Sequence, residues 1–149
     1  MQRDLPSIAD LVEAGRLIPQ APDARALGDA LAAASRDLLA ADANRETFTP
    51  WADAMLYEAG LRCARVIVLA GGYRIDAGAK AHMTAIDGAD ALTGHRHHRL
   101  FVRLHRMRRR RNDFMYATAP DPTEQDLSQA RLDVEAVLAL ARSALDSVR

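Results

Sequence analysis

Cysteine, lysine and long apolar runs are scarce in this chain. Cys63 is the only cysteine, which excludes an intramolecular disulfide and leaves nothing that points to an oxidising compartment. Lys80 is the only lysine, so arginine supplies almost all of the positive charge. The longest apolar run, residues 63–70, contains Arg65 and is too short to span a bilayer. The acidic N-terminus lacks the apolar core of a signal peptide, so the sequence predicts a soluble, cytoplasmic protein without membrane contact.

The sequence motifs of common enzymes are absent as well. There is no GxGxxG, GxxxxGK[ST], GxSxG, CxxC or HExxH, which removes the familiar dinucleotide, P-loop, hydrolase, thiol-redox and zinc-protease classes. No cofactor is therefore expected. At 149 residues, without internal repeats or a linker, the chain is predicted to form a single domain over residues 1–149.

Charge is distributed unevenly along the chain. The formal net charge is zero, but residues 95–111 contain eight arginines and no carboxylate, a formal charge of +8 with neutral histidines. The rest of the chain must therefore carry a charge near −8. Such separation bears on binding partners more than the neutral total does.

Apolar spacing predicts an all-helical protein. Stripes at helical period, punctuated by capping residues and glycines, indicate an all-α antiparallel bundle of four to five long helices with a short N-terminal helix. Asp23 is expected to cap the second helix, Thr49 the third and Asp121 the last. The segments 17–19 and 73–74 are expected to be a connector and a loop. The predicted helices cover residues 6–13, 24–39, 50–70, 76–92, 95–116 and 122–145.

The basic helix carries an apolar stripe that contains one arginine. The residues in line are Leu100, Leu104, Met107, Arg111, Phe114 and Met115. An arginine among core positions must be paired or hydrogen-bonded. Asn112 and Tyr116 share a face next to it, and Arg111 and Tyr116 can serve one site only if the helix ends near Tyr116 or a second subunit contributes. These three residues, Arg111, Asn112 and Tyr116, are the candidate site.

The remaining arginines have two interpretations. In the first, Arg106 and Arg108 to Arg110 belong to a solvated face and pair with Asp126, Asp133, Glu135, Asp87 and Asp90. In the second, the basic helix is a track for a phosphate backbone, with stacking aromatics. The candidate nucleic-acid-binding residues are Arg103, Arg106, Arg108, Arg109 and Arg110.

Four histidines in the same helix raise the question of a metal. His95, His97, His98 and His105 offer imidazole ligands, but they stand among arginines, and no carboxylate or cysteine is close to the cluster in sequence. The prediction is therefore that no metal binds. His82, on the preceding helix, is expected to be packed or to line a cleft.

The end of the basic helix resembles HEPN domains. Their motif is an arginine followed by Asn, Asp or His, with a histidine four to six residues after the arginine. The sequence of Ala70-Gly71-Gly72-Tyr73-Arg74, then His82, then RRRRNDFMY and an acidic last helix is similar to short bacterial HEPN proteins over most of the chain. The resemblance implies a homodimeric helical bundle, metal-independent cleavage or binding of RNA or a nucleotide, and in some members a nucleotidyltransferase partner in a toxin–antitoxin pair.

By position, the resemblance makes Arg111 the motif arginine and Asn112 its polar neighbour, with Arg74 and His82 lining the cleft. Tyr116 stands where the histidine is expected. Tyrosine has an ordinary pKa of about 10, so Tyr116 is a poor proton acceptor near neutrality. Three hypotheses stay open: an RNA-directed protein, a non-catalytic interaction module, and a buried polar network that only fixes helix packing.

Overall fold

The computed structural model describes residues 5–116 and 120–149. Within them the helices are α1 (Ile8–Glu13), α2 (Ala24–Asn44), α3 (Thr49–Ala70), α4 (Ala81–Leu92), α5 (His98–Met115) and α6 (Glu124–Asp146). The strands β1 (Leu17–Pro19) and β2 (Tyr73–Ile75) form one small antiparallel sheet. The predicted all-α bundle is confirmed.

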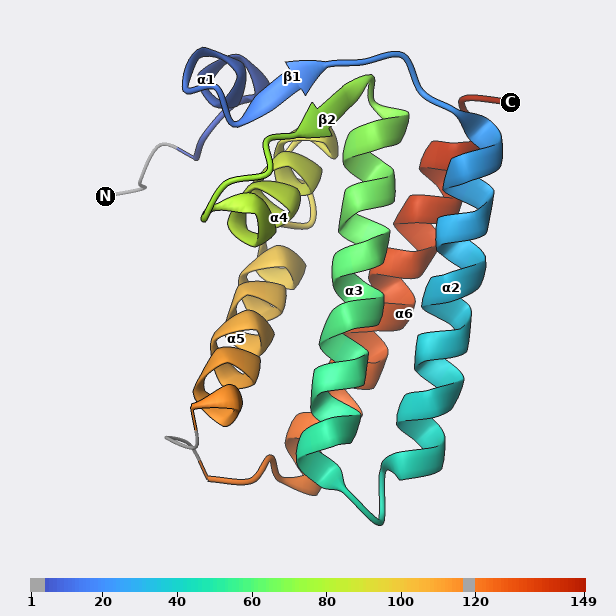
Figure 1. The fold of residues 1–149 in the computed structure, drawn as a ribbon, viewed down its shortest axis with the longest axis vertical. Helices are drawn as coiled ribbons and strands as arrows, with labels where there is room; N and C mark the ends of the chain where they lie inside the picture. The colour runs from blue at the N-terminus through green and yellow to red at the C-terminus, as the bar shows by residue number, and fades with distance from the viewer. Residues whose placement is uncertain (1–4, 117–119) are drawn as a thin grey trace.

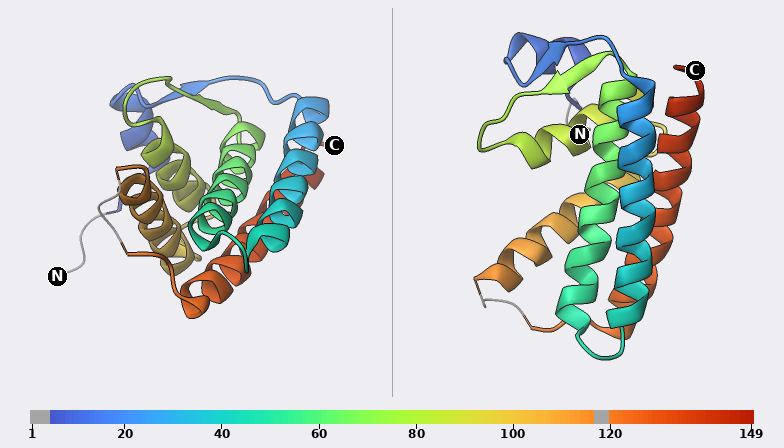
Figure 2. Two further views of the ribbon diagram at one scale, coloured as in Figure 1. Left: turned by 60° about the horizontal axis from the view of Figure 1, so that its bottom comes forward. Right: turned by 45° about the vertical axis from the view of Figure 1, so that its right-hand side comes forward.

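Helix α3 is the centre of the bundle (Figure 1). It packs against α2, α6, α4 and α5, and buried residues occur on all sides of it. Helices α2 and α3 run antiparallel, whereas α3 and α6 run in the same direction. Helices α4 and α5 together cover one side of α3 and α2 the other, as the two turned views in Figure 2 also show. Because α3 contributes the most buried residues, it fixes where α4 and α5 lie.

The distance between α3 and α5 is set by a close contact between Gly60 and Leu104. A Cβ built at Gly60 would lie 2.8 Å from Cδ1 of Leu104, so only glycine lets Leu104 pack this closely on α3. Leu104 is fully buried, and its truncation to alanine typically costs about 2–5 kcal/mol. The next turn of α5, with Arg108 and Arg111, is thereby held beside α3.

Two predicted connections are wrong, because residues 17–19 and 73–75 form the strands. Leu17 pairs with Ile75 and Pro19 with Tyr73. Strands of three residues carry too little periodic pattern to be recognised, and their pairing partner lies more than fifty residues away in the chain. The sheet ties the N-terminal segment to the end of α3.

Several predicted helix starts are also wrong; α5, for example, begins at His98 rather than at residue 95. Helix α4 begins at Ala81 rather than at residue 76, because Gly78 and the small residues around it have no apolar face to bury. Helix α6 is capped by Thr123 rather than Asp121: the Thr123 hydroxyl accepts from the Asp126 amide, while the Asp126 carboxylate accepts from the Thr123 amide. Asp23 caps α2 as predicted, whereas α3 begins one residue earlier than expected, at Thr49 after Phe48.

Candidate functional site

The arginines of α5 divide into two groups, and those of the first pair with buried carboxylates. Arg103 contacts both carboxylate oxygens of Asp133 at 3.0 Å, and Arg110 makes two hydrogen bonds to Asp53. Both aspartates are buried, at 4% and 5% exposure. Burial favours a neutral Arg110, but its hydrogen bonds to the Asp53 carboxylate outweigh burial and raise the Arg110 pKa. These two arginines therefore neutralise carboxylates inside the protein. Pairing was predicted for Arg110 but with other acids than Asp53, and Asp133 pairs with Arg103, for which no pairing was predicted.

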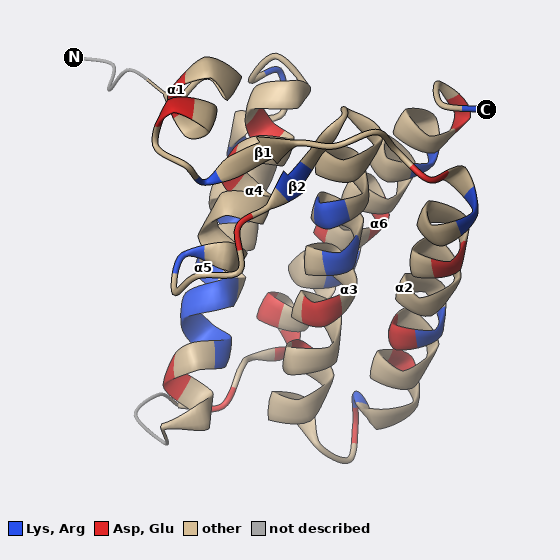
Figure 3. Cartoon of the chain, turned by 45° about the horizontal axis from the view of Figure 1, so that its top comes forward, with Lys and Arg blue, Asp and Glu red and all other residues tan. Residues whose placement is uncertain are grey.

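A second group faces a cavity of about 620 Å³ between α3, α4 and α5. We call it the arginine cavity. Its wall is formed by Arg65 of α3, His82 of α4, Arg108, Arg111 and Asn112 of α5, and small residues from the segment 77–83. Figure 3 shows the basic colour of α5 concentrated in consecutive turns, close to the start of α4. Three cationic side chains thus converge on one hollow.

The cations of the arginine cavity are only partly compensated. Arg111 lies 3.4 Å from Glu58, and both side chains are about one third exposed. Among the residues that the structure describes, Arg65 and Arg108 have no ion pair with a carboxylate, and the buried Nε of Arg108 has no hydrogen-bond partner. A buried unpaired guanidinium N–H is costly unless an acceptor reaches it. An anion in the cavity would supply such an acceptor.

His82 of the cavity wall contacts the fully buried Tyr57 behind it. The hydroxyl of Tyr57 and Nδ1 of His82 are 3.0 Å apart. Burial lowers the pKa of His82, and the charges of Arg65 and Arg111 lower it further, against an opposing effect of Glu58. Burial raises the pKa of the Tyr57 hydroxyl, with a contribution from Glu58. At neutral pH the cavity therefore holds a neutral imidazole beside a protonated tyrosine.

The other predicted site residues lie elsewhere. Arg74 is exposed on β2 and is not part of the cavity wall. Arg106 and Arg109 are exposed on α5. Tyr116 caps the C-terminal end of α5 and is 74% exposed, so the predicted helix end at this residue is confirmed, but its side chain does not line the cavity.

The apolar stripe of α5 is buried only in its first three turns. Leu100, Leu104 and Met107 are core residues, whereas Met115 is 56% exposed, which corrects its expected place in the stripe. The physical reason is that α5 ends at Met115, where Phe114 still reaches Trp51 edge-on at 5.3 Å. Arg111 follows the last core residue by one turn, which places it at the border between core and solvent.

Sequence reasoning missed Arg65, Tyr57 and Glu58 as members of the site. Arg65 did interrupt the longest apolar run, and an arginine in such a place is the signal that could have found it. Tyr57 and Glu58 gave no comparable signal, because only the packing of α3 on α4 and α5 brings them to His82 and Arg111.

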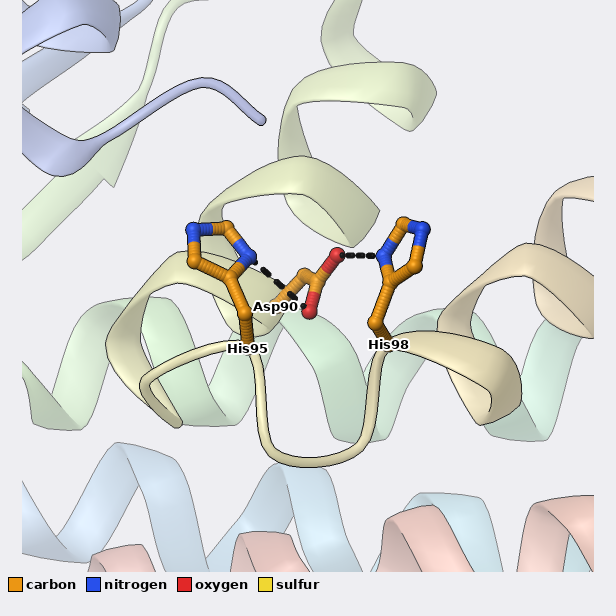
Figure 4. A group of neighbouring side chains, drawn as sticks. All are labelled: Asp90, His95 and His98. Carbon is orange, nitrogen blue, oxygen red and sulfur yellow. Dashed lines mark hydrogen bonds and ion pairs between the residues drawn. The ribbon is translucent and has the colours of Figure 1, made fainter. Parts of the chain in front are cut away.

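A separate cluster stands where α4 turns into α5 (Figure 4). The carboxylate of Asp90 lies between His95 and His98, and the three ligand atoms are within 4.8 Å of one another. The metal prediction had assumed that no carboxylate accompanies these histidines; the turn brings one to them. His105 instead contacts Asp87 at 2.9 Å.

The comparisons with known proteins leave the family open. No family model, no curated protein and no solved structure matches the chain. Over the described residues, no helix combines the length and apolar character needed to cross a membrane.

Proposed function

We propose that the arginine cavity binds the phosphate backbone of single-stranded RNA. The observation that carries this proposal is the convergence of Arg65, Arg108 and Arg111 on one hollow. Within residues 5–116 and 120–149, Glu58 is the only carboxylate that pairs with an arginine of its wall. Guanidinium groups bind phosphate oxygens through paired, charge-assisted hydrogen bonds. A phosphate in the hollow would also supply the acceptor that the Arg108 Nε lacks.

Features around the cavity support a nucleic acid rather than a free anion. Asn112 is exposed at the rim and offers an amide to the backbone. Trp51 and Tyr116 are exposed at the end of α5, where bases can stack on them. The exposed Arg106 and Arg109 add long-range attraction. RNA is favoured over DNA by the resemblance of the RRRRNDFMY segment to HEPN domains.

For RNA cleavage at this site we propose His82, rather than Tyr116, as the proton-transfer group. In the tautomer with the proton on Nδ1, this nitrogen donates to the Tyr57 oxygen, and Nε2 is left to accept a proton. The 2′-OH would give its proton to Nε2 while its oxygen attacks the adjacent phosphorus, forming a 2′,3′-cyclic phosphate and releasing the 5′-oxygen, protonated by solvent. Arg111 and Arg108 would hold the phosphate.

The test is fluorescence anisotropy of a labelled single-stranded RNA, measured in EDTA over a series of salt concentrations. The double variant Arg108→Gln/Arg111→Gln is expected to bind at least about tenfold more weakly than the parent, because it removes two phosphate contacts. Arg36→Gln on α2 removes an exposed arginine far from α5 and is the matched control. Equal affinities for the double variant, the control and the parent would contradict the proposal.

The same samples, run on a denaturing gel, distinguish binding from cleavage. Products that disappear in His82→Ala but persist in Tyr116→Phe support His82 as the proton-transfer group. Products that persist in His82→Ala contradict that role. Intact RNA with salt-dependent binding assigns the protein to the binding class alone.

A second candidate function is a homodimeric interaction module. Four large apolar side chains are exposed around the loop end of α3 and the end of α5: Phe48, Trp51, Met115 and Tyr116. A surface with this many exposed aromatic residues favours a second copy of the chain as its partner. Light scattering after gel filtration tests this: Trp51→Ser/Met115→Ser is expected to convert a dimer into a monomer, and a parent that is monomeric at all concentrations would contradict it.

A further inference from the structure

The turn from α4 to α5 holds three potential ligands in an unusual backbone. Asp90 is in the last turn of α4, and its side chain is only 9% exposed. His95 is in the turn, and His98 is the first residue of α5. Figure 4 shows the two imidazoles on either side of the carboxylate, each with Nδ1 directed at it.

Only one side of this cluster is satisfied by hydrogen bonding. Nδ1 of His98 and Oδ2 of Asp90 are 2.7 Å apart and form a hydrogen bond. Nδ1 of His95 lies 3.3 Å from Oδ1 of Asp90, but the two atoms do not form a hydrogen bond. Both atoms are buried and have no other partner in the described chain. Buried polar atoms without a hydrogen-bond partner cost free energy, and a ligand bound between the two atoms removes this cost.

The backbone at His95 supports the same conclusion. Its φ of +58° lies in the left-handed region, which a residue with a Cβ adopts at a cost in free energy. The preceding Gly94, at φ +65°, adopts this conformation freely. A glycine at residue 95 would therefore suit the turn better than a histidine, and strain of this kind gathers at binding sites. In the turn, the His95 amide also donates to the Asp90 carbonyl at 3.0 Å.

We propose that Asp90, His95 and His98 bind one divalent transition-metal ion, with Zn²⁺ as the best match. Two imidazoles and a carboxylate are ligands that zinc accepts. In tetrahedral zinc with bonds of about 2.0–2.1 Å, neighbouring ligand atoms are about 3.3–3.4 Å apart. The His95–Asp90 separation of 3.3 Å already has this value. Three protein ligands leave the fourth position to water or to a substrate oxygen.

The neighbouring arginines are compatible with a dication. Arg96 and Arg99 are both exposed, so water and salt screen their charges beyond about 8 Å. Arg103 is neutralised by Asp133. The Asp90 carboxylate supplies a negative charge directly at the site. The repulsion that the sequence suggested is therefore weak at the cluster itself.

The cluster is distinct from the arginine cavity. His98 and Arg111 are thirteen residues apart on α5, which corresponds to roughly 20 Å along the helix axis. The residues of the cluster do not line the cavity. Loss of metal binding and loss of RNA binding can thus be observed independently.

The experiment is calorimetric titration of the full-length, tag-free protein with Zn²⁺, followed by Co²⁺ titration with visible spectroscopy. We expect one ion per chain and, for Co²⁺, the strong visible absorption of a four-coordinate ion. Asp90→Asn is expected to weaken binding at least about tenfold. His97→Gln is the matched control, because His97 lies between the two ligands in sequence but outside the cluster, and its side chain makes no capping hydrogen bond.

A second variant, His95→Gly, removes a ligand without adding backbone strain, so a loss of metal binding in it cannot be attributed to unfolding. His95→Gly relieves the left-handed backbone, so its melting temperature without metal is expected to equal or exceed that of the parent. Zn²⁺ at a hundredfold excess over Kd is expected to raise the parent's melting temperature by on the order of 5–10 °C and to leave that of His95→Gly unchanged. The proposal is overturned if the parent binds no stoichiometric ion, if His95→Gly binds as tightly as the parent, or if His97→Gln loses as much affinity as His95→Gly.

Discussion

Arg110 and Arg111 are neighbours on α5, yet they belong to two different electrostatic regions. Arg110 makes two hydrogen bonds to Asp53, which is buried in α3. Arg111 faces the arginine cavity and lies 3.4 Å from Glu58, whose side chain is about one third exposed. A rotation of about 100° between successive helical residues therefore separates an arginine in a buried ion pair from an arginine that faces a cavity. The same residue type pairs with a buried carboxylate on one face and lines the arginine cavity, our proposed RNA site, on the other.

The largest expected effect is the loss of a buried pair. Arg110→Met leaves the Asp53 carboxylate uncompensated, so it is expected to lower the free energy of unfolding by about 3–5 kcal/mol. Urea denaturation measures the change. Adding Asp53→Leu to this variant removes the stranded charge and is expected to recover most of the loss. If the free energy of unfolding of Arg110→Met lies within about 1 kcal/mol of the parent's, the Arg110–Asp53 pair does not stabilise the fold as proposed.

Salt dependence separates the two faces more directly. Arg108→Gln is expected to reduce the slope of log K against log salt for single-stranded RNA by about 0.7, because one phosphate contact is lost. Arg103→Gln removes the same charge from the paired face and is expected to leave that slope unchanged, although it destabilises the fold. Anisotropy titrations at several salt concentrations provide the slopes. Equal slopes for the two variants would contradict the assignment of Arg108 to the RNA site.

The titration of His82 tests the field inside the cavity. Burial and the arginines lower its pKa from the ordinary value of 6.5, so NMR is expected to give a midpoint below 6.5, and RNA is expected to raise it. Affinity for RNA should therefore rise as the pH falls. Because the folded-state pKa is the lower one, stability is fully present above about pH 6.5 and is lost as the pH falls through the folded pKa. A midpoint above 6.5 without RNA would contradict the cavity's positive field.

The smallest effect is expected at an exposed arginine. Arg109→Gln should change the free energy of unfolding by less than about 0.5 kcal/mol, and should change RNA affinity far less than Arg108→Gln at the same salt concentration. Denaturation and anisotropy measure the two quantities. A loss of affinity equal to that of Arg108→Gln would show that net charge, rather than the cavity, determines binding.

The sequence was informative where a pattern repeats and uninformative where distant segments meet. The long helices follow from apolar periodicity, and Arg111 was recognised because it interrupts the stripe of α5. The wall of the cavity could not be derived in this way, since Arg65 and His82 reach it from two other helices. Asp90 likewise joins His95 and His98 only because residues 93–97 reverse the chain.

Asp87 of α4 contacts both Arg16, which precedes β1, and His105 of α5, so it links the local unfolding of these three segments. Burial alone raises the pKa of Asp87, but hydrogen bonds from His105 and Arg16 lower it below its ordinary value. Arg16, just before β1, also donates to Thr84 of α4, so the N-terminal segment clamps α4 against α5. Hydrogen exchange would then report α4 and the sheet as one cooperative unit that opens before the α2–α3–α6 core. Since α4 supplies one wall of the arginine cavity, a ligand bound between α4 and α5 is expected to slow hydrogen exchange in α4 and in the sheet that opens with it.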